Sequence, residues 1–232
     1  MQLVLVRHAQ PERALAASGP ADPGLTELGV EQAGRVPAAL ARLEIGAHRI
    51  ARVVSSPQRR ARETAAPTAE KLGLPVDVVD GLAEYDRELP AYVPIEAARG
   101  WAAGSVPADA SAPPEELLEE FRATYRRIKA GYLPEQIDGP AFVARVLAAV
   151  DEIASTTAHS DTVVVFAHGG VINVLLQDVL GLARPLTFPI DYCSITRILY
   201  SRAGARTAAT VNENGHVWDL LPRNIAAGQG RD

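Results

Sequence analysis

The chain has 232 residues, of which 47% are hydrophobic, so it can form one large domain or two small ones around a packed core. Its formal net charge of -5 argues against a general nucleic-acid or membrane surface, because those partners favour a basic face. The single cysteine, Cys193, excludes an intramolecular disulfide framework and is expected to be a small buried residue. No basic region precedes the short N-terminal apolar run, and no segment approaches the ~20 apolar residues that span a bilayer. These features predict a cytoplasmic globular protein.

The first third of the chain alternates short apolar runs with helix-forming segments, which is typical of parallel strands that are covered on both faces. The predicted elements are a strand over Leu3 to Val6, a helix from Thr26 to about Leu43, a strand over Ile50 to Val54, a helix from Ser56 to about Leu72, and a strand over Val76 to Val79. Thr26 and Ser56 are expected to be helix N-caps, and Pro57 suits the first position of the second helix. Gly73 is expected to end that helix.

From about Tyr85 to Pro140 the alternation breaks, and we expect a largely helical insertion, or lid, over the strand ends. Within it, Glu115 to Lys129 is charged and amphipathic, which predicts a helix on a solvated surface. The remaining predicted elements are a helix over Ala141 to Ala154, a strand over Val163 to Phe166, a helix over Gly170 to Val179, strands over Ile195 to Tyr200 and Thr207 to Val211, and a loose tail over Arg223 to Asp232. No internal repeat or boundary is found, so residues 1–232 are expected to form a single α/β domain.

Two histidines end matching apolar runs. His8 follows Leu3 to Arg7, and His168 follows Val163 to Ala167 and precedes two glycines. In open α/β sheets, ligands bind beyond the carboxyl ends of the strands, where helix N-termini favour anions. Two imidazoles with Arg7 beside them therefore predict a phosphate site.

Three arginines fall in the first turns of the helix after Ser56, where the helix dipole already places positive charge. Surface salt bridges are the expected explanation for Arg59 and Arg62. Arg60 can point back over the strand ends, and a guanidinium binds phosphate oxygens bidentately. Arg7 and Arg60 together are expected to neutralise most of a phosphoryl dianion.

Four segments, in this order, resemble the signatures of the histidine phosphatase superfamily, also called the phosphoglycerate mutase-like family. They are Leu5 to Ala9, Ser55 to Pro57 followed by Arg60, Ala61, Thr64 and Ala65, then Leu82 to Glu84, and Val165 to Gly170, with Asn212 to His216 similar to the family's closing motif. The resemblance implies a three-layer α/β/α sandwich with a mostly parallel sheet and a phosphohistidine intermediate on His8. It also implies a phosphate pocket of Arg7, Arg60 and His168. Glu84 would be the proton donor, and no metal or other cofactor would be used.

Physical reasoning about these residues agrees with the implied mechanism. A neutral His8 can attack phosphorus and split hydrolysis into two displacements through a covalent intermediate. His168 would serve better as an imidazolium that donates to a phosphoryl oxygen. The leaving alkoxide needs a proton, which a carboxyl group with a raised pKa can supply. Glu84 matches the family's Leu-x-Glu, although Asp86 and Glu88 on the same loop are alternatives.

Departures from the family pattern favour a phosphatase. The distinctive Asn of the mutase branch is absent from Gln10 to Arg13, and Tyr85 to Pro90 replaces the Gly-x-Trp-Glu-Gly run of many relatives. A phosphomonoester hydrolase is therefore expected, with a phosphoglycerate-type mutase as the alternative. A non-catalytic phospho-ligand binding module would have lost His8 or the acid, and neither is lost.

The insertion is expected to contact the rest of a small phosphorylated substrate. Tyr85, Arg87, Tyr92 and Trp101 can line that side, with Arg87 as an anion contact, although packing in a small core also explains the aromatic residues. Gly169 is expected beside the phosphate. No His-x-x-x-His motif or cysteine pair is present, so no metal site is expected. Neither nucleic acid nor a membrane is an expected partner, and a homodimer is left open.

Overall fold

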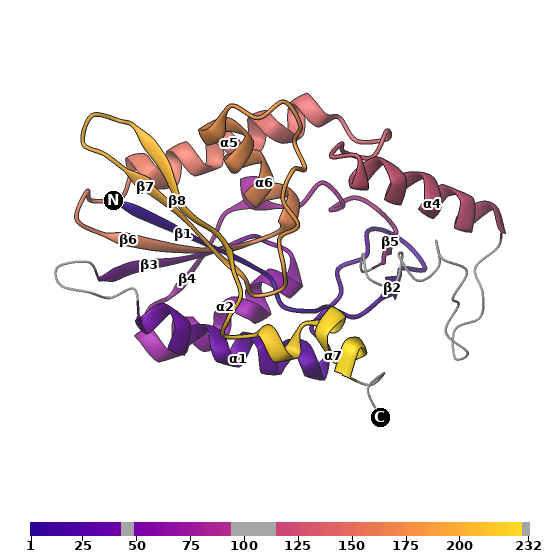
Figure 1. Ribbon diagram of the computed structural model, residues 1–232, viewed down its shortest axis with the longest axis horizontal. Helices are drawn as coiled ribbons and strands as arrows, with labels where there is room; N and C mark the ends of the chain where they lie inside the picture. The colour runs from indigo at the N-terminus through magenta and orange to yellow at the C-terminus, as the bar shows by residue number, and fades with distance from the viewer. Residues whose placement is uncertain (43–48, 94–114, 229–232) are drawn as a thin grey trace.

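The computed structural model describes residues 1–42, 49–93 and 115–228. Its centre is a six-stranded mixed sheet with the strand order β4-β3-β6-β1-β7-β8 (Figure 1). The strands are β1 (Gln2–Arg7), β3 (Ile50–Ser55), β4 (Val76–Val78), β6 (Thr162–Ala167), β7 (Ile195–Tyr200) and β8 (Arg206–Glu213). The pairs β4-β3, β3-β6 and β6-β1 are parallel, and β1-β7 and β7-β8 are antiparallel. The predicted strands and the mostly parallel sheet are confirmed.

Helices cover both faces of this sheet. Side chains alternate between the faces along each buried strand, so both faces present apolar residues that pack against helices. Leu3 and Leu5 belong to a core with α5 (Gly139–Ser155) and α6 (Gly169–Leu180). Val4 and Val6 face the opposite way, into a core with α1 (Glu27–Ala41) and α2 (Arg59–Leu72). Figure 1 shows these two helix pairs on opposite sides of the sheet. The fold is the expected three-layer α/β/α sandwich.

The start of α2 differs from the prediction. The helix begins at Arg59, so Ser56 is not its N-cap and Pro57 is not its first residue. The Ser56 hydroxyl instead lies 2.7 Å from Nε2 of His168, which belongs to a distant part of the chain. The Asp22 carboxylate accepts the N–H of Arg59 at 2.8 Å and so occupies one donor of the first turn. A tertiary contact therefore replaces the local cap.

Two other helix ends follow the sequence prediction. The Thr26 hydroxyl accepts the N–H of Gly29 at 2.9 Å and caps α1. Gly73 ends α2 with φ of 64°, a left-handed conformation that glycine adopts without strain. Gly29 also allows a close approach, since a Cβ there would lie 2.1 Å from the carbonyl oxygen of Gln10.

The expected insertion begins after the 3-10 helix η1 (Asp80–Leu82). Its strand β5 (Ala91–Tyr92) pairs antiparallel with β2 (Ala14–Leu15), a strand that the sequence did not predict. The predicted helix over Glu115 to Lys129 is confirmed as α4 (Glu115–Lys129). Trp101 lies outside the described residues.

The chain end is more ordered than predicted. A short helix, α7 (Pro222–Gly228), occupies the start of the expected loose tail, and a 3-10 helix, η2 (Trp218–Leu220), lies just before it. The Arg223 guanidinium pairs with the Asp191 carboxylate, which fixes the first turn of α7 to the loop before β7. Of the helices in the described ranges, none has the length and apolar composition needed to span a membrane.

Candidate active site

The two predicted histidines meet at the carboxyl ends of adjacent strands. β1 and β6 are parallel neighbours with Arg7 opposite Ala167, so the next residue of each strand reaches the same edge. The rings of His8 and His168 have centroids 5.1 Å apart, and both side chains are buried. The parallel register therefore brings together two residues that are 160 positions apart in the sequence.

His8 is held in one neutral tautomer. Its Nδ1 lies 2.8 Å from the carbonyl oxygen of Ala9. A carbonyl only accepts, so Nδ1 carries the hydrogen and Nε2 keeps its lone pair. Burial, together with the positive charges of Arg60 and Arg7, holds the pKa of His8 well below its usual 6.5. The neutral form required for nucleophilic attack is thus favoured at neutral pH.

His168 is neutral in the protein without a ligand. Its imidazolium form is predicted for the complex with a phosphoryl dianion, and it stays a prediction. Burial and the charges of Arg60, His8 and Arg7 hold its pKa well below 6.5. Its Nε2 lies 2.7 Å from the Ser56 hydroxyl, whereas its buried Nδ1 has no hydrogen-bond partner among the described residues. Protonation of this ring would require the negative charge of a phosphoryl group nearby.

Arg60 is fully buried and reaches the strand ends, as the sequence predicts. Its Nη2 donates to both carboxylate oxygens of Asp86, at 2.9 and 3.0 Å. The Tyr92 ring lies against the guanidinium, 4.4 Å from its carbon to the ring centroid. Nε and Nη1 of Arg60 are buried without a hydrogen-bond partner in the described ranges. Two nitrogen atoms of this cation, which carry three N–H groups, therefore remain for an anion.

Arg7 is the second cation of the cluster. Its guanidinium carbon lies 4.1 Å from the centroid of the Tyr192 ring, and its Nη1 donates to the carbonyl of Ile190. By contrast, Arg59 forms an exposed ion pair with Glu63 at 2.6 Å, the surface role expected for it.

Glu84 lies beside the histidines in a buried position that favours its protonated form. Its Oε2 accepts the N–H of Gly170 at 2.7 Å, and its Oε1 accepts the N–H of Tyr85 at 3.1 Å. Burial raises the pKa of Glu84 to about 7, and the charge of Asp86 acts in the same direction. A Cβ on residue 170 would lie 2.2 Å from Glu84 Oε1, so Gly170 makes room for the carboxyl group.

The alternative acids have other partners. Asp86 is engaged by Arg60, as described above, and the Glu88 side chain is 77% exposed and paired with Arg87. Arg87 also pairs with Asp80, at 2.9 and 3.0 Å, and it is not among the residues that line the cavity. The geometry therefore does not support Arg87 as a substrate contact.

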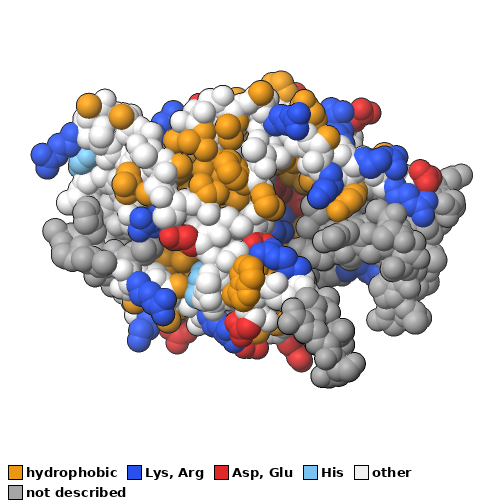
Figure 2. Space-filling model, in the orientation of Figure 1, with side chains coloured by type: hydrophobic (Ala, Val, Ile, Leu, Met, Phe, Trp, Pro, Cys, Tyr) orange, Lys and Arg blue, Asp and Glu red, His pale blue; other side chains and the backbone are white. Residues whose placement is uncertain are grey.

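A cavity of about 550 Å³ opens onto this cluster. The residues that line it include Arg7, His8, Arg60, Glu84 and Gly169, whereas the fully buried His168 lies behind them and is not part of the lining. Figure 2 shows acidic and basic side chains recessed in a hollow beside the loop that follows α6. The rest of the lining is rich in aromatic and aliphatic residues: Tyr85, Leu89, Tyr92, Val93, Tyr125, Ile128, Leu186, Phe188, Tyr192 and Leu221. Tyr85 and Tyr92 thus line the cavity as predicted.

One part of the cavity rim was missed by sequence reasoning. The Asp191 carboxylate accepts from Asn212 Nδ2 at 3.0 Å and also pairs with Arg223. His216 lies nearby, with its Nε2 3.0 Å from the carbonyl oxygen of Cys193. In the segment Asn212 to His216, His216 is expected to brace the edge of the pocket rather than to take part in catalysis, and the structure shows that this segment braces the loop before β7.

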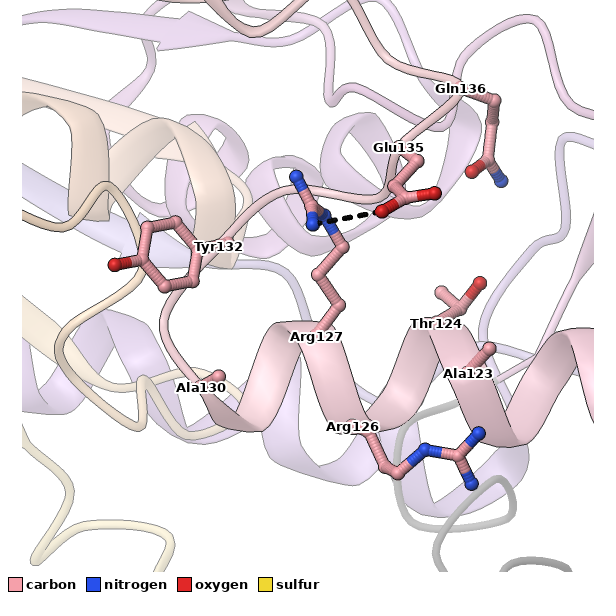
Figure 3. A pocket seen from close by; sticks show the side chains of 8 residues that line it. All are labelled: Ala123, Thr124, Arg126, Arg127, Ala130, Tyr132, Glu135 and Gln136. Atoms are coloured by element: carbon pink, nitrogen blue, oxygen red, sulfur yellow. Dashed lines mark hydrogen bonds and ion pairs between the residues drawn. The ribbon is translucent and has the colours of Figure 1, made fainter.

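A second pocket of about 490 Å³ lies on α4 and the loop after it (Figure 3). It contains the ion pair between Arg127 and Glu135, at 3.1 Å, and no histidine, cysteine or pair of carboxylates is found among the described residues that line it. Within the described ranges, no group of three His, Cys, Asp or Glu side chains could hold a metal ion. The chemistry is therefore assigned to the cavity over β1 and β6.

The fold and the cluster of buried histidines and arginines define a class of phosphoryl-transfer enzyme. The model of the Histidine phosphatase superfamily (branch 1) matches residues 3–213, so this chain belongs to that superfamily. The predicted family and the predicted phosphatase activity, a phosphoric monoester hydrolase, are confirmed by this match and by the structural neighbours.

Solved structures give the same result. The mycobacterial glucosyl-3-phosphoglycerate phosphatase Rv2419c is 25% identical, with a TM-score of 0.63 over 91% of this chain and 98% of that chain. A putative alpha-ribazole-5'-P phosphatase from Escherichia coli is 21% identical, with a TM-score of 0.64 over 92% of this chain and 97% of that chain, and it shows the shared fold.

A curated relative matches over a shorter segment. The Bifunctional protein Rv2228c of Mycobacterium tuberculosis is 44% identical over 87 residues, which are 37% of this chain and 23% of that protein. The aligned segment therefore spans less than a quarter of that relative.

Proposed function

We propose that this phosphatase hydrolyses phosphomonoesters through a phosphohistidine formed on Nε2 of His8. The observation that carries the proposal is the hydrogen bond from Nδ1 of His8 to the Ala9 carbonyl, which leaves Nε2 unprotonated within the cationic cluster. The His8 ring lies 5.1 Å from the His168 ring, centroid to centroid, and a protonatable carboxyl group, Glu84, lines the same cavity as His8.

In the first step, the Nε2 lone pair attacks phosphorus as the bond from phosphorus to the ester oxygen breaks. Glu84 gives its proton to the leaving oxygen, so the alcohol departs neutral. Arg7, Arg60 and His168 stabilise the negative charge on the three remaining phosphoryl oxygens. The approaching dianion also favours the protonated form of His168.

In the second step, water attacks the phosphohistidine and gives a proton to the Glu84 carboxylate. The bond between nitrogen and phosphorus breaks, and inorganic phosphate leaves. His8 returns to its neutral form and Glu84 to its acid form, so the cycle closes without a further reactant.

We further infer that the substrate is a small molecule with a bulky organic group. The cavity volume of about 550 Å³ falls in the range of small-molecule sites. Tyr85, Tyr92 and Phe188 in its wall suit an apolar or ring-containing group beyond the phosphate.

The proposal is tested by trapping the intermediate. Wild-type protein mixed with a phosphomonoester and quenched in alkali should carry phosphate on His8, which mass spectrometry locates, and it should release inorganic phosphate stoichiometric with the alcohol. His8→Ala should lose essentially all turnover, whereas His159→Ala, a change at an exposed histidine, should be normal. Substantial turnover of His8→Ala would defeat the covalent mechanism, and an isomer formed with little free phosphate would indicate a mutase.

A further inference from the structure

Asp86 is the acidic partner of the most buried cation in the site. Both of its carboxylate oxygens lie within 3.0 Å of Arg60 Nη2, and the side chains are 15% and 0% exposed, respectively. A fully buried guanidinium is costly unless a negative charge and hydrogen bonds compensate it. Asp86 supplies both.

The pairing divides the donors of Arg60 into two sets. Nη2 is used by Asp86, while Nε and Nη1 have no partner in the part of the chain that the structure describes. The Tyr92 ring lies against the guanidinium and limits its rotation. Because Asp86 holds Nη2, the orientation of the two remaining donors is fixed before any ligand arrives.

Gln58 connects the same carboxylate to Glu84. Its Nε2 donates to Asp86 Oδ1 at 2.9 Å, and its Oε1 accepts the backbone N–H of Glu84 at 2.7 Å. Gln58 is the N-cap residue of α2, and Arg60 follows it two positions later in the first turn of the helix. Asp86 therefore ties the first turn of α2 to the loop that carries the acid.

We propose that Asp86 is a positioning residue for this phosphatase, which orients Arg60 toward the phosphoryl group and, through Gln58, fixes the acid beside it. The proposal rests on the proposed function of Arg60 and Glu84. Asp86 acts through these neighbours and does not transfer the proton, because both of its oxygens face Arg60. Its charge also supports the raised pKa of Glu84.

A simple charge argument predicts the opposite effect on anion binding. A carboxylate near the phosphate subsite repels an anion, so its removal should tighten the binding of vanadate or phosphate. Positioning predicts weaker binding, because Arg60 loses the partner that orients it. The sign of the change therefore separates the two explanations.

The test compares Asp86→Asn with Glu88→Gln, which neutralises an exposed carboxylate on the same loop. We expect Asp86→Asn to weaken competitive inhibition by vanadate about tenfold or more, in line with the loss of a hydrogen bond to a charged group. The alkaline limb of kcat/KM should also move to lower pH, because Glu84 loses a neighbouring negative charge. Glu88→Gln should change neither quantity. Unchanged or tighter vanadate binding by a folded Asp86→Asn protein would overturn the proposal.

A second comparison covers the case in which Asp86→Asn does not fold. It compares Arg60→Ala with the double variant Arg60→Ala/Asp86→Asn. Both lack the cation, and the double variant also lacks the carboxylate, so it contains no buried unpaired charge at this position. Asp86 acting through Arg60 predicts that the double variant binds vanadate as well as Arg60→Ala, or better. A further loss of affinity in the double variant would contradict the proposal. The proposed function is tested separately by trapping phosphate on His8 of the wild-type protein. If no phosphohistidine forms in wild type, the proposed function is wrong, whatever the Asp86 variants show.

Discussion

At neutral and alkaline pH, replacing Glu84 by glutamine should lower activity sharply without lowering the stability of the fold. The pKa of Glu84 is raised by burial from 4.5 to about 7, which corresponds to about 3 kcal/mol of unfavourable ionisation in the folded protein. Between these two pH values the folded protein retains a proton that the unfolded chain has released. The free energy of unfolding therefore falls as the pH rises from 4.5 to about 7, and the full penalty is present above that range. Glutamine carries no such penalty.

The substitution also removes a hydrogen bond. The two carboxyl oxygens accept the N–H groups of Gly170 and Tyr85, and the amide nitrogen of glutamine cannot accept either. One unsatisfied buried N–H costs about 1 to 3 kcal/mol. At about pH 8 the Glu84→Gln protein should thus range from equally stable to about 2 kcal/mol more stable than wild type. At about pH 5, where the buried carboxyl group is largely protonated, the variant should be the less stable protein.

Activity should fall sharply in the same variant. Loss of a positioned proton donor costs about a hundredfold or more for an alkyl phosphate, and less for an aryl phosphate whose leaving group needs less protonation. In wild type, kcat/KM should decline as the pH rises through about 7, because the acid loses its proton. Glu84→Gln should lack this alkaline limb.

Urea unfolding at about pH 5 and about pH 8, with kcat/KM profiles for both kinds of ester, measures these effects. His8 and His168 titrate in both proteins, so their contribution cancels in the difference between wild type and variant. A stability difference that is the same at both pH values would refute the buried, raised pKa of Glu84. Nearly normal turnover with alkyl phosphates would place the acid elsewhere.

Three further predictions concern the rest of the site. Gly170→Ala should lower kcat about a hundredfold or more, because the new Cβ meets Glu84 Oε1 at 2.2 Å. Gly34→Ala, in the exposed part of α1 with no atom within 4 Å of the new Cβ, should retain most activity, and equal losses would contradict the reasoning. The acid limb of kcat/KM should lie well below pH 6.5, because burial and two arginines lower the pKa of His8. It is measured with an ester whose own titration is known, and a limb at or above pH 6.5 would show that His8 titrates as an ordinary histidine. EDTA should leave the rate unchanged and vanadate should inhibit competitively, because the arginines and histidine of the site supply the charge stabilisation. Loss of activity in EDTA that a divalent ion reverses would show that a metal is required.

The sequence predicts the fold and the centre of the site well because both depend on short-range patterns. The buried strands appear as continuous apolar runs, and the parallel arrangement places their carboxyl ends at one edge. His8 and His168 come directly after such strands, so their meeting follows from the register of β1 and β6. Their motifs also carry the family resemblance, which supplied the preference for Glu84.

The failed predictions involve partners that are distant in the sequence. Ser56 has the local pattern of an N-cap, yet its hydroxyl lies against His168. The tail was expected to be loose, yet Arg223 pairs with a carboxylate 32 positions earlier in the chain. Propensity and spacing do not contain these pairings, because each depends on how separate segments pack.

Asp86 illustrates why two neighbouring carboxylates on one loop should not be treated as equivalent. Arg60 is fully buried near Glu84 and lowers the pKa of that carboxyl group, which by itself would favour the ionised and catalytically wrong form. Asp86 offsets this effect by pairing with Arg60 and by adding a negative charge beside Glu84, so the site can hold a cation for the phosphate and a protonated acid for the leaving group. Glu88, which is exposed and paired with Arg87, has no such influence on either group. Phosphate binding by Arg60 and proton donation by Glu84 are therefore compatible, because Arg60 pairs with Asp86 and lowers the pKa of Glu84 less than it would without that partner.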